Sequence, residues 1–354
     1  MTLFEPIFQH SMVQVNILSI LQESIVVLPE FSVLLTLIIA LLLDKTLGEA
    51  KRFHYLVGFG WLASKVEALL NPYCLEKNTT PATVKTVSVI KTKLLGAIAW
   101  GLLVLPLPVL YYCFSEQLTS YGQILVDATI LYLAIGLNSL QQHAMQIYRP
   151  LKSGDLKTAR RFTGYIVSRE TSALSEQEMS RATVESMLEN GHDAVIASLV
   201  YYLIGGAPLV ILHRLANTLD AMWGYKNSRF INFGYASARL DDVLGFVSGK
   251  CSTLLYALQG LPKQRCYQAI YNAYSQGNQY KSHNGGWVMA AGATVMAIKL
   301  GGSAQYHGKV VHSVTLGTGD EVTSEDIPNS LKVVIRASLL VVITVLIFQL
   351  IAHC

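Results

Sequence analysis

Long apolar stretches separated by polar segments run through most of the chain. A helix that crosses a bilayer needs about 20 mainly apolar residues, and four stretches reach about this length: 25–43, 94–114, 121–140 and 335–352. The third contains Asp127, a charge that is costly in lipid and is expected to face protein or the interface. The pattern predicts an all-α polytopic membrane protein with about four transmembrane helices.

A fifth apolar stretch, 194–212, carries no charged residue but contains a helix-breaking sequence. Gly205-Gly206-Ala207-Pro208 lies in its second half, where glycine disfavours a helix and proline removes a backbone hydrogen bond. Such a segment either crosses the bilayer with a kink or enters the bilayer and returns. The flanking charges decide between these arrangements, because short loops rich in Lys and Arg stay on the cytoplasmic side.

The distribution of basic residues indicates that both ends of 194–212 lie in the cytoplasm. The segment 44–93 has eight basic residues against four acids, 148–193 has seven basic residues, and 115–120 has none. If 194–212 crossed the membrane, the basic residues after it would be exported, against the rule. We therefore predict a re-entrant segment at 194–212 in a protein of the cell (inner) membrane, with both termini outside. The predicted large, helical cytoplasmic loops are 44–93, 148–193 and 213–334.

The composition agrees with a membrane protein and excludes other classes. Hydrophobic residues make up 52% of the chain and charged residues 14%, with a mean hydropathy of +0.39, whereas soluble domains carry about 25% charged residues. A formal net charge of +4 is too small to indicate nucleic acid as a partner. Five cysteines are scattered without a CxxC pair. We find no internal repeat, and predict one membrane domain, 1–354, in contact with the lipid bilayer.

The first polar cluster is predicted to be a helix with a charged face. Ser175 and Glu178 form a capping box at its start. Arg181, Glu185 and Glu189 then recur every four residues, and Asp193 extends this face. Carboxylates that converge beside a re-entrant hairpin suit Mg²⁺, which prefers oxygen ligands and brings phosphate with it. A solvated helix face with alternating charges is the other interpretation.

A second polar cluster follows the re-entrant stretch. It comprises 217–229 and 238–242, which are rich in Asn, Asp, Lys and Arg. Its basic residues are suited to phosphate oxygens and its acids to metal. A basic loop next to the membrane explains the same residues equally well. A third cluster, 282–287, precedes a short apolar run and Gly301-Gly302, and its glycines suit either close helix packing or approach to a ligand.

Standard nucleotide-binding fingerprints are missing from the sequence. Gly245 to Lys250 has three intervening residues where a P-loop needs four, and Cys251 replaces the Ser or Thr that should follow the lysine.

Across these clusters the sequence resembles the CobD/CbiB family of integral-membrane cobalamin-biosynthesis proteins, the adenosylcobinamide-phosphate synthases. The resemblance covers nearly the whole chain, with the motifs in the family's order. It is carried by Leu43-Asp44 with Gly48 and His54, 168–172, Glu185 with Glu189-Asn190 and Asp193, 217–220, 224–227, 237–243, Ser282 with Asn284 and Trp287, and 300–302.

The resemblance implies an ATP-dependent ligase that forms an amide between adenosylcobyric acid and aminopropanol or its phosphate. It implies Mg²⁺ as cofactor, because carboxylate activation through phosphoryl transfer needs positive charge on the phosphates. It suggests other cobalamin-assembly enzymes as partners at the membrane, and a corrinoid that lies near Trp223, Tyr225 and Trp287.

The residues that match the family's motifs receive roles as hypotheses. Catalytic roles fall to Glu185, Glu189, Asp193 and Asp220, and metal binding to these four and Asp241. Phosphate binding falls to Arg169, Lys226 and Arg239. Substrate binding falls to Asn190, Asn217, Tyr225, Asn227, Ser282, Asn284 and Trp287.

The chain departs from the family pattern mainly at backbone-shaping residues. It has Gly48-Glu49-Ala50 where the family usually has Gly-Asp-Pro, and His54-Tyr55 where the family has His-Pro. This is typical of a divergent member that keeps the charged groups. The alternative is a non-catalytic membrane sensor like the distantly similar AmpE branch, but a sensor has little need to keep these acids and bases together.

Overall fold

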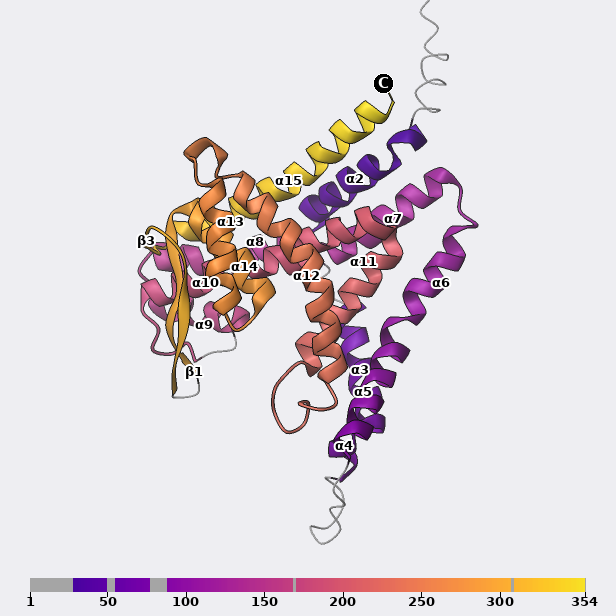
Figure 1. Ribbon diagram of the computed structural model, residues 1–354, viewed down its shortest axis with the longest axis horizontal. Helices are drawn as coiled ribbons and strands as arrows, with labels where there is room; N and C mark the ends of the chain where they lie inside the picture. The colour runs from indigo at the N-terminus through magenta and orange to yellow at the C-terminus, as the bar shows by residue number, and fades with distance from the viewer. Residues whose placement is uncertain (1–27, 50–54, 77–87, 168–169, 307–308, 354) are drawn as a thin grey trace, which may run out of the picture.

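The structure is a computed structural model that describes residues 28–49, 55–76, 88–167, 170–306 and 309–353. Helices form most of it, and one small sheet lies at one side (Figure 1). In chain order the α-helices are α2 (Ser32–Leu47), α3 (Tyr55–Leu70), α4 (Pro72–Glu76), α5 (Val89–Val104), α6 (Pro106–Ser115), α7 (Ser120–Ala134), α8 (Leu137–Lys152), α9 (Leu156–Ile166), α10 (Glu176–Gly191), α11 (Ala197–Trp223), α12 (Tyr235–Leu258), α13 (Cys266–Ser275), α14 (His283–Met296) and α15 (Asp326–Ala352). Short 3₁₀ or π segments are η1 (Leu28–Phe31), η3 (His192–Ile196), η4 (Leu261–Lys263) and η5 (Gly277–Gln279).

Four helical stretches in the described part of the chain are long and apolar enough to cross a membrane. They are Val89–Ser115, Ser120–Lys152, Glu176–Trp223 and Asp326–Ala352. Large apolar side chains on them, such as Leu110 and Phe348, are exposed on the protein surface, as lipid-facing side chains are. The chain is a helical membrane protein, as the hydrophobic pattern predicts.

The predicted spans agree with these stretches in part. The spans predicted at 94–114 and 335–352 lie inside long helical stretches. The span predicted at 25–43 corresponds to η1 and α2, and α2 alone has 16 residues; residues 25–27 lie outside the described part. The span predicted at 121–140 lies inside the stretch Ser120–Lys152. Within it Ile135 is extended (φ −77°, ψ 132°) and separates α7 from the polar helix α8.

The stretch 194–212 forms a broken hairpin inside the bundle. Gly205 (φ −157°, ψ 28°) and Gly206 (φ 64°, ψ −162°) interrupt α11, and the chain reverses there. The rings of Tyr201 and His213 stack with centroids 4.9 Å apart, although twelve residues of straight helix span about 18 Å. The predicted break at these glycines and the return of the chain are therefore confirmed.

The two ends of the bundle differ in what they contain. Gly205 and Gly206 line a cavity of about 400 Å³ together with Ser32 and Ser120, at the beginnings of α2 and α7. Figure 1 shows the end of α15, the beginning of α2 and the α6–α7 turn at this same end. The second half of α11 runs from Gly206 back to Trp223, and α12 begins at Tyr235 after a short loop. The hairpin thus reaches toward this end of the bundle and returns.

A three-stranded sheet adds to the helical architecture and was not predicted. Strand β1 (Ile298–Tyr306) pairs antiparallel with β2 (Lys309–Gly317), and the short β3 (Asp320–Glu321) pairs parallel with β1. The register shifts between Leu300 and Gly302, and Gly301 and Gly302 have positive φ of 76° and 81°. Hydropathy did not reveal the strands because the sheet is small and packs on α14 and α10 rather than forming its own apolar core.

Two apolar cores hold the helices together. The larger core joins α2, α7, α8, α10, the first half of α11, α14 and α15. The smaller core contains buried residues of α3, α5, the second half of α11 and Phe233. The polar groups of the candidate site lie where the hairpin passes from one core to the other.

Candidate functional site

The open end of the α11 hairpin collects acidic side chains from three elements. Asp193 lies in η3, at the beginning of the first arm, and Asp220 lies near the end of the second arm. Asp241 lies in the second turn of α12. Asn217 Nδ2 lies 3.4 Å from Asp241 Oδ1 and links α11 to α12. Asp193 and Asp220, which are 27 residues apart in sequence, therefore come together because the chain reverses at Gly205-Gly206, and Asp241 joins them from α12.

These carboxylates affect one another electrostatically. Burial, together with the negative charges of Asp193 and Asp220, raises the pKa of Asp241 to about 8. The hydrogen bond from Asn217 acts in the opposite direction and offsets only part of this. Like charges held this close favour protonation or a bound cation. This arrangement favours a site that receives positive charge.

A histidine and an arginine complete the acidic cluster. His192 is buried, with Nε2 3.0 Å from Ser248 Oγ and Nδ1 2.9 Å from Asp193 Oδ1. Arg214 follows His213 on the second arm, and its buried Nε has no hydrogen-bond partner among the described residues. A buried guanidinium donor that lacks a partner is costly, and it is suited to an anionic ligand.

The N-terminus of α14 approaches the cluster from the side. Ser282 caps this helix by accepting a hydrogen bond from the Gly285 amide. A Cβ on Gly285 would lie 2.5 Å from Glu189 Oε1, so only glycine lets the helix end meet this carboxylate. A carboxylate at a helix N-terminus interacts favourably with the helix dipole. Asn284 donates to the Asp242 carbonyl oxygen at 2.9 Å and joins α14 to α12.

Two residues of the predicted charged face on α10 hold the sheet instead. The capping box of Ser175 and Glu178 is present. Arg181 Nη1 donates to the Gly301 carbonyl oxygen at 2.9 Å, and Glu185 Oε1 accepts from the Gly301 amide at 2.8 Å. These bonds give Glu185, a predicted metal and catalytic residue, a structural partner at the bulge of β1.

Several predicted binding residues lie on the surface after α11. Tyr225, Lys226 and Asn227 are exposed, and Asn227 Oδ1 accepts hydrogen bonds from the amides of Arg229 and Phe230, which closes a turn. Lys226 extends from the same turn, close in sequence to Asp220.

Other predicted residues have local partners or fall outside the description. Arg239 is exposed, and its Nη1 lies 3.8 Å from Asp242. Asn190 donates to Ser186 in its own helix. Arg169 lies outside the described residues.

Trp223 and Trp287, near which the resemblance places a corrinoid, differ in how far they are buried. Trp223 is 1% exposed and packs against Phe233, so the expectation that a corrinoid lies near it is wrong because this ring is part of the smaller core. Trp287 is half-buried and donates from Nε1 to Asn278 Oδ1 at 2.7 Å. Lys250 Nζ lies over the Trp287 ring, and burial lowers the pKa of this lysine to about 8.

The acidic side chains are suited to a cation that a ligand also binds, and not to a cation bound by protein groups alone. Within the described ranges, no three His, Cys, Asp or Glu side chains are arranged to hold a metal ion. Mg²⁺ is usually held by one or two carboxylates together with substrate phosphates. Asp193, Asp220 and Asp241 are suited to that kind of binding because they lie close enough to raise the pKa of Asp241.

Sequence reasoning did not assign roles to His192, Ser248 or Arg214. His213 stacks on Tyr201 and is a packing residue. His192 is different because it contacts both Asp193 and Ser248. Its position directly before Asp193 was the one available signal. Nothing in the pattern linked Ser248 to it, because 56 residues separate the two.

Comparison with known proteins places this helical membrane protein in a family. The family model described as CobD/Cbib protein matches residues 37–334. A cobalamin biosynthesis protein CobD of Chromobacterium violaceum is 43% identical over 300 residues, which cover 84% of this chain and 91% of that protein. Proteins of the same name from Stutzerimonas stutzeri and Halalkalibacterium halodurans are 43% and 33% identical, each over 86% of this chain and 93% of the relative.

The matched residues 37–334 include the hairpin and the sheet of this helical membrane protein. The chain belongs to the CobD/CbiB family. No solved structure matches it.

Proposed function

We propose that this protein is an enzyme of cobalamin biosynthesis that joins adenosylcobyric acid to aminopropanol or aminopropanol phosphate in an ATP-dependent reaction. The shared name of its relatives supports the role in cobalamin biosynthesis. The observation that supports the chemistry is the meeting of Asp193, Asp220 and Asp241 with the half-buried Arg214, whose Nε is buried without a partner among the described residues, at the open end of the hairpin. Acids and a base that converge in this way suit a phosphate-bearing substrate.

The proposed reaction has two steps, phosphorylation of the carboxylate and then attack by the amine. The corrinoid carboxylate attacks the terminal phosphorus of ATP, which gives an acyl phosphate and ADP. The neutral amine then attacks the acyl carbon, the C–N bond forms, phosphate leaves, and the amine's proton passes to a base. A free carboxylate is a poor electrophile, so the amide does not form without this activation.

The residues of the chain take separate roles in this scheme. One or two of Asp193, Asp220 and Asp241 would hold Mg²⁺ together with the substrate phosphates, and the ion would offset the negative charge of the transferring phosphate. Arg214 binds a phosphate or the corrinoid carboxylate, and the exposed Lys226 and Arg239 draw anions toward the site. His192, held by Ser248, positions Asp193.

The amino alcohol is expected at the N-terminus of α14. Glu189 lies there against Gly285, and a carboxylate binds the charged amine before it loses its proton. Ser282 and Asn284 lie in the same turn and orient the hydroxyl or phosphate end of the substrate.

An assay with defined substrates tests this proposal. Purified protein in detergent is incubated with adenosylcobyric acid, Mg-ATP and either amine, and mass spectrometry detects the amide. We expect product that is lost in Glu189→Gln and Asp220→Asn, and kept in the matched control Glu116→Gln, which lies at the opposite end of the bundle. Absence of product with both amines, while the Chromobacterium violaceum relative forms it under the same conditions, would overturn the proposal and favour a regulatory role.

A further inference from the structure

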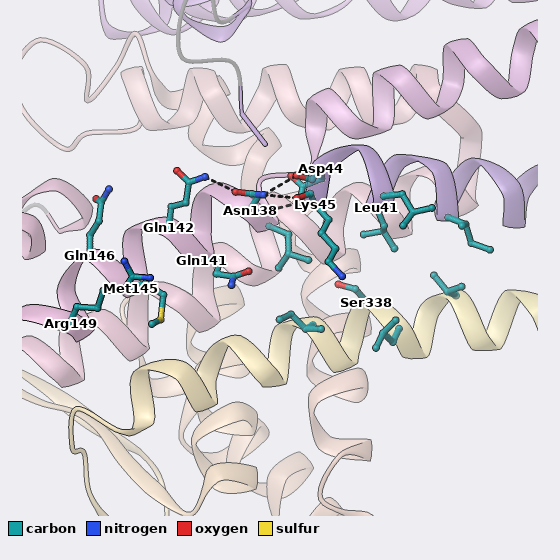
Figure 2. Close-up of a pocket in the computed structure, with 16 residues that line it drawn as sticks. Leu41, Asp44, Lys45, Asn138, Gln141, Gln142, Met145, Gln146, Arg149 and Ser338 are labelled. Atoms are coloured by element: carbon teal, nitrogen blue, oxygen red, sulfur yellow. Dashed lines mark hydrogen bonds between the residues drawn. The ribbon is translucent and has the colours of Figure 1, made fainter. Parts of the chain in front are cut away.

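A groove separate from the acidic cluster lies between α2, α8 and α15 (Figure 2). Its volume is about 810 Å³, within the range of about 300–1,000 Å³ that is typical of small-molecule sites. Apolar residues of α2 and α15, such as Leu41 and Leu339, form one side. Polar residues of α8 form the other side. The groove is therefore amphipathic.

The groove lies where three helices pass from an apolar to a polar environment. The apolar run of α2 ends at Leu43 and is followed by Asp44 and Lys45. Apolar α7 ends at Ala134, and the polar helix α8 begins at Leu137. The apolar part of α15 begins after Arg336. A groove at this level extends from the hydrocarbon region into the headgroup region, and it suits a ligand with both apolar and polar surfaces.

Primary amides line the α8 side of the groove. Asn138, Gln141, Gln142 and Gln146 have helical spacing, so they share one side of α8, and all four line the groove. Asn138 donates to the carbonyl oxygens of Asp44 and Lys45, and its own oxygen accepts from Gln142. The side chains of Gln141 and Gln146 form no hydrogen bond with other described residues. Because an amide both donates and accepts, these two complement a ligand that itself carries amides.

The two basic residues that line the groove, Lys45 and Arg149, indicate how wide its ligand is. Figure 2 shows Lys45 reaching toward Ser338 of α15, while Arg149 lies at the far end beyond Gln141 and Met145. Asn138, next to Lys45, and Arg149 are eleven residues apart on α8, about 16 Å along a helix. A wide, flat molecule can contact both cations and also the amides between them.

The groove adjoins the acidic cluster. The amide of Gly136 donates to the carbonyl oxygen of Ala194 at 3.1 Å, and Ala194 directly follows Asp193. Leu137, next to Gly136, lines the groove. A ligand that fills the groove therefore lies beside the arm of the hairpin that carries Asp193.

We infer that this groove binds the corrinoid ring of the substrate, a conclusion that rests on the proposed function. A corrinoid is a flat macrocycle with methyl groups on its faces and a rim of carboxamide side chains. Its faces match the apolar side chains of α2 and α15, and its rim matches Gln141 and Gln146 of α8. The ring then lies at the membrane surface while its one free carboxylate extends toward Asp193 and Arg214.

Binding measurements on the full chain test this inference. Cobyric acid is titrated into the protein in detergent, and quenching of tryptophan fluorescence reports Kd. We expect Gln141→Leu with Gln146→Leu to raise Kd by about tenfold or more, since each lost hydrogen bond weakens binding about fivefold. Gln117→Leu, an exposed glutamine in the α6–α7 turn, is the matched control and is expected to leave Kd unchanged.

A second measurement does not depend on the double variant being folded. A Met145→Cys thiol in the groove is labelled with a maleimide, and mass spectrometry separates it from the native cysteines. We expect cobyric acid to slow its labelling severalfold and to leave the labelling of the exposed Cys113 unchanged. Equal labelling with and without a corrinoid that is shown to bind would overturn the groove assignment.

The outcomes separate the groove from the proposed function. A wild-type protein that binds no corrinoid would overturn both. Normal corrinoid binding in the double variant, with a change in co-purifying phospholipid instead, would overturn the groove assignment alone and indicate a lipid site. Weaker corrinoid binding in the double variant, with binding kept in Asp193→Asn, would support the groove as the corrinoid site.

Discussion

The rings of Tyr201 and His213 stack with their centroids 4.9 Å apart although both residues lie in α11, twelve positions apart. This contact exists because the chain reverses at Gly205 and Gly206. The Tyr201 hydroxyl also donates to the Leu244 carbonyl oxygen at 2.6 Å and ties the hairpin to α12. The reversal therefore decides which polar groups meet at the open end of the hairpin.

Replacing Gly206 is expected to weaken the hairpin. At φ 64° and ψ −162° a side chain is strained, so we expect Gly206→Ala to lower the free energy of unfolding by about 1–3 kcal/mol and the melting temperature in detergent with it. The matched control is Gly58→Ala in α3, where a Cβ meets nothing within 4 Å. That change is expected to be neutral or to stabilise by about 0.5–1 kcal/mol. Equal effects of both changes would contradict the broken hairpin.

The topology prediction is tested by reporter fusions. A reporter placed after Ser120 and one placed after Arg229 are expected on opposite sides of the membrane, because 115–120 has no basic residue and the loops on either side of the hairpin are basic. A fusion after Arg181, before the hairpin, should agree with the fusion after Arg229. An external Arg229 with a cytoplasmic Arg181 would mean that the hairpin crosses the membrane once.

Neutralising one acid of the cluster is expected to reduce enzymatic activity much more than it reduces thermal stability. Asp193→Asn, Asp220→Asn and Asp241→Asn should each reduce amide formation by about 100-fold or more, because charge on the phosphates is no longer offset. Asp220→Asn and Asp241→Asn should leave the melting temperature unchanged or higher, because like charges repel one another in the cluster. Asp193→Asn also weakens the contact with His192 Nδ1 at 2.9 Å and should lower it. The exposed Asp242→Asn is the control and should keep activity. Clear destabilisation by all three changes would indicate a structural role instead.

Replacing Arg229 is expected to destabilise the protein more than replacing its ion-pair partner Glu67. Arg229 Nε and Nη2 lie 2.6 and 2.8 Å from the two carboxylate oxygens, and Glu67 is 3% exposed while Arg229 is 47% exposed. Arg229→Met leaves a buried charge and should destabilise by about 2 kcal/mol or more. Glu67→Gln leaves an arginine that reaches water and should cost less. Thermal denaturation of both variants and of the double variant measures the difference, and the double variant should recover part of the loss.

Lys250 is expected to react at a lower pH than an ordinary lysine. Acylation needs the neutral amine, and burial lowers the pKa of Lys250 to about 8, whereas an ordinary lysine titrates near 10.4. The rate of acetylation, measured at this residue by mass spectrometry, should therefore rise through pH 8. Trp287→Leu reduces the burial and should move the midpoint upward. A midpoint near 10 in the wild-type protein would contradict this prediction.

The local sequence was sufficient for features that depend on neighbouring residues. Apolar runs predicted the helical membrane class, because burial in lipid depends on the hydrophobicity of about 20 consecutive residues. The helix break at Gly205-Gly206 and the capping box of Ser175 and Glu178 were also predicted. In each case the conformational preference or the hydrogen bond involves residues within a few positions of one another.

The sequence alone was not sufficient for contacts between distant segments. The sequence pattern placed Glu185 on a charged helix face. In the structure β1 lies next to α10, and the Gly301 amide donates a hydrogen bond to this carboxylate. Trp223 fitted a surface aromatic, but packing with Phe233 buries it. Both outcomes depend on how helices pack, and hydropathy within one helix carries no information about which partner will cover it.

The sequence by itself determined that this chain is a helical membrane protein with a break in its central apolar segment, because hydrophobicity and backbone preference act locally. Only the tertiary structure decided that Asn217 meets Asp241, that His192 meets Ser248, and that an amide-lined groove forms between α2, α8 and α15. These sites arise where the hairpin and the helix ends converge. Their positions depend on the packing of residues that are far apart in the chain, which no local pattern specifies.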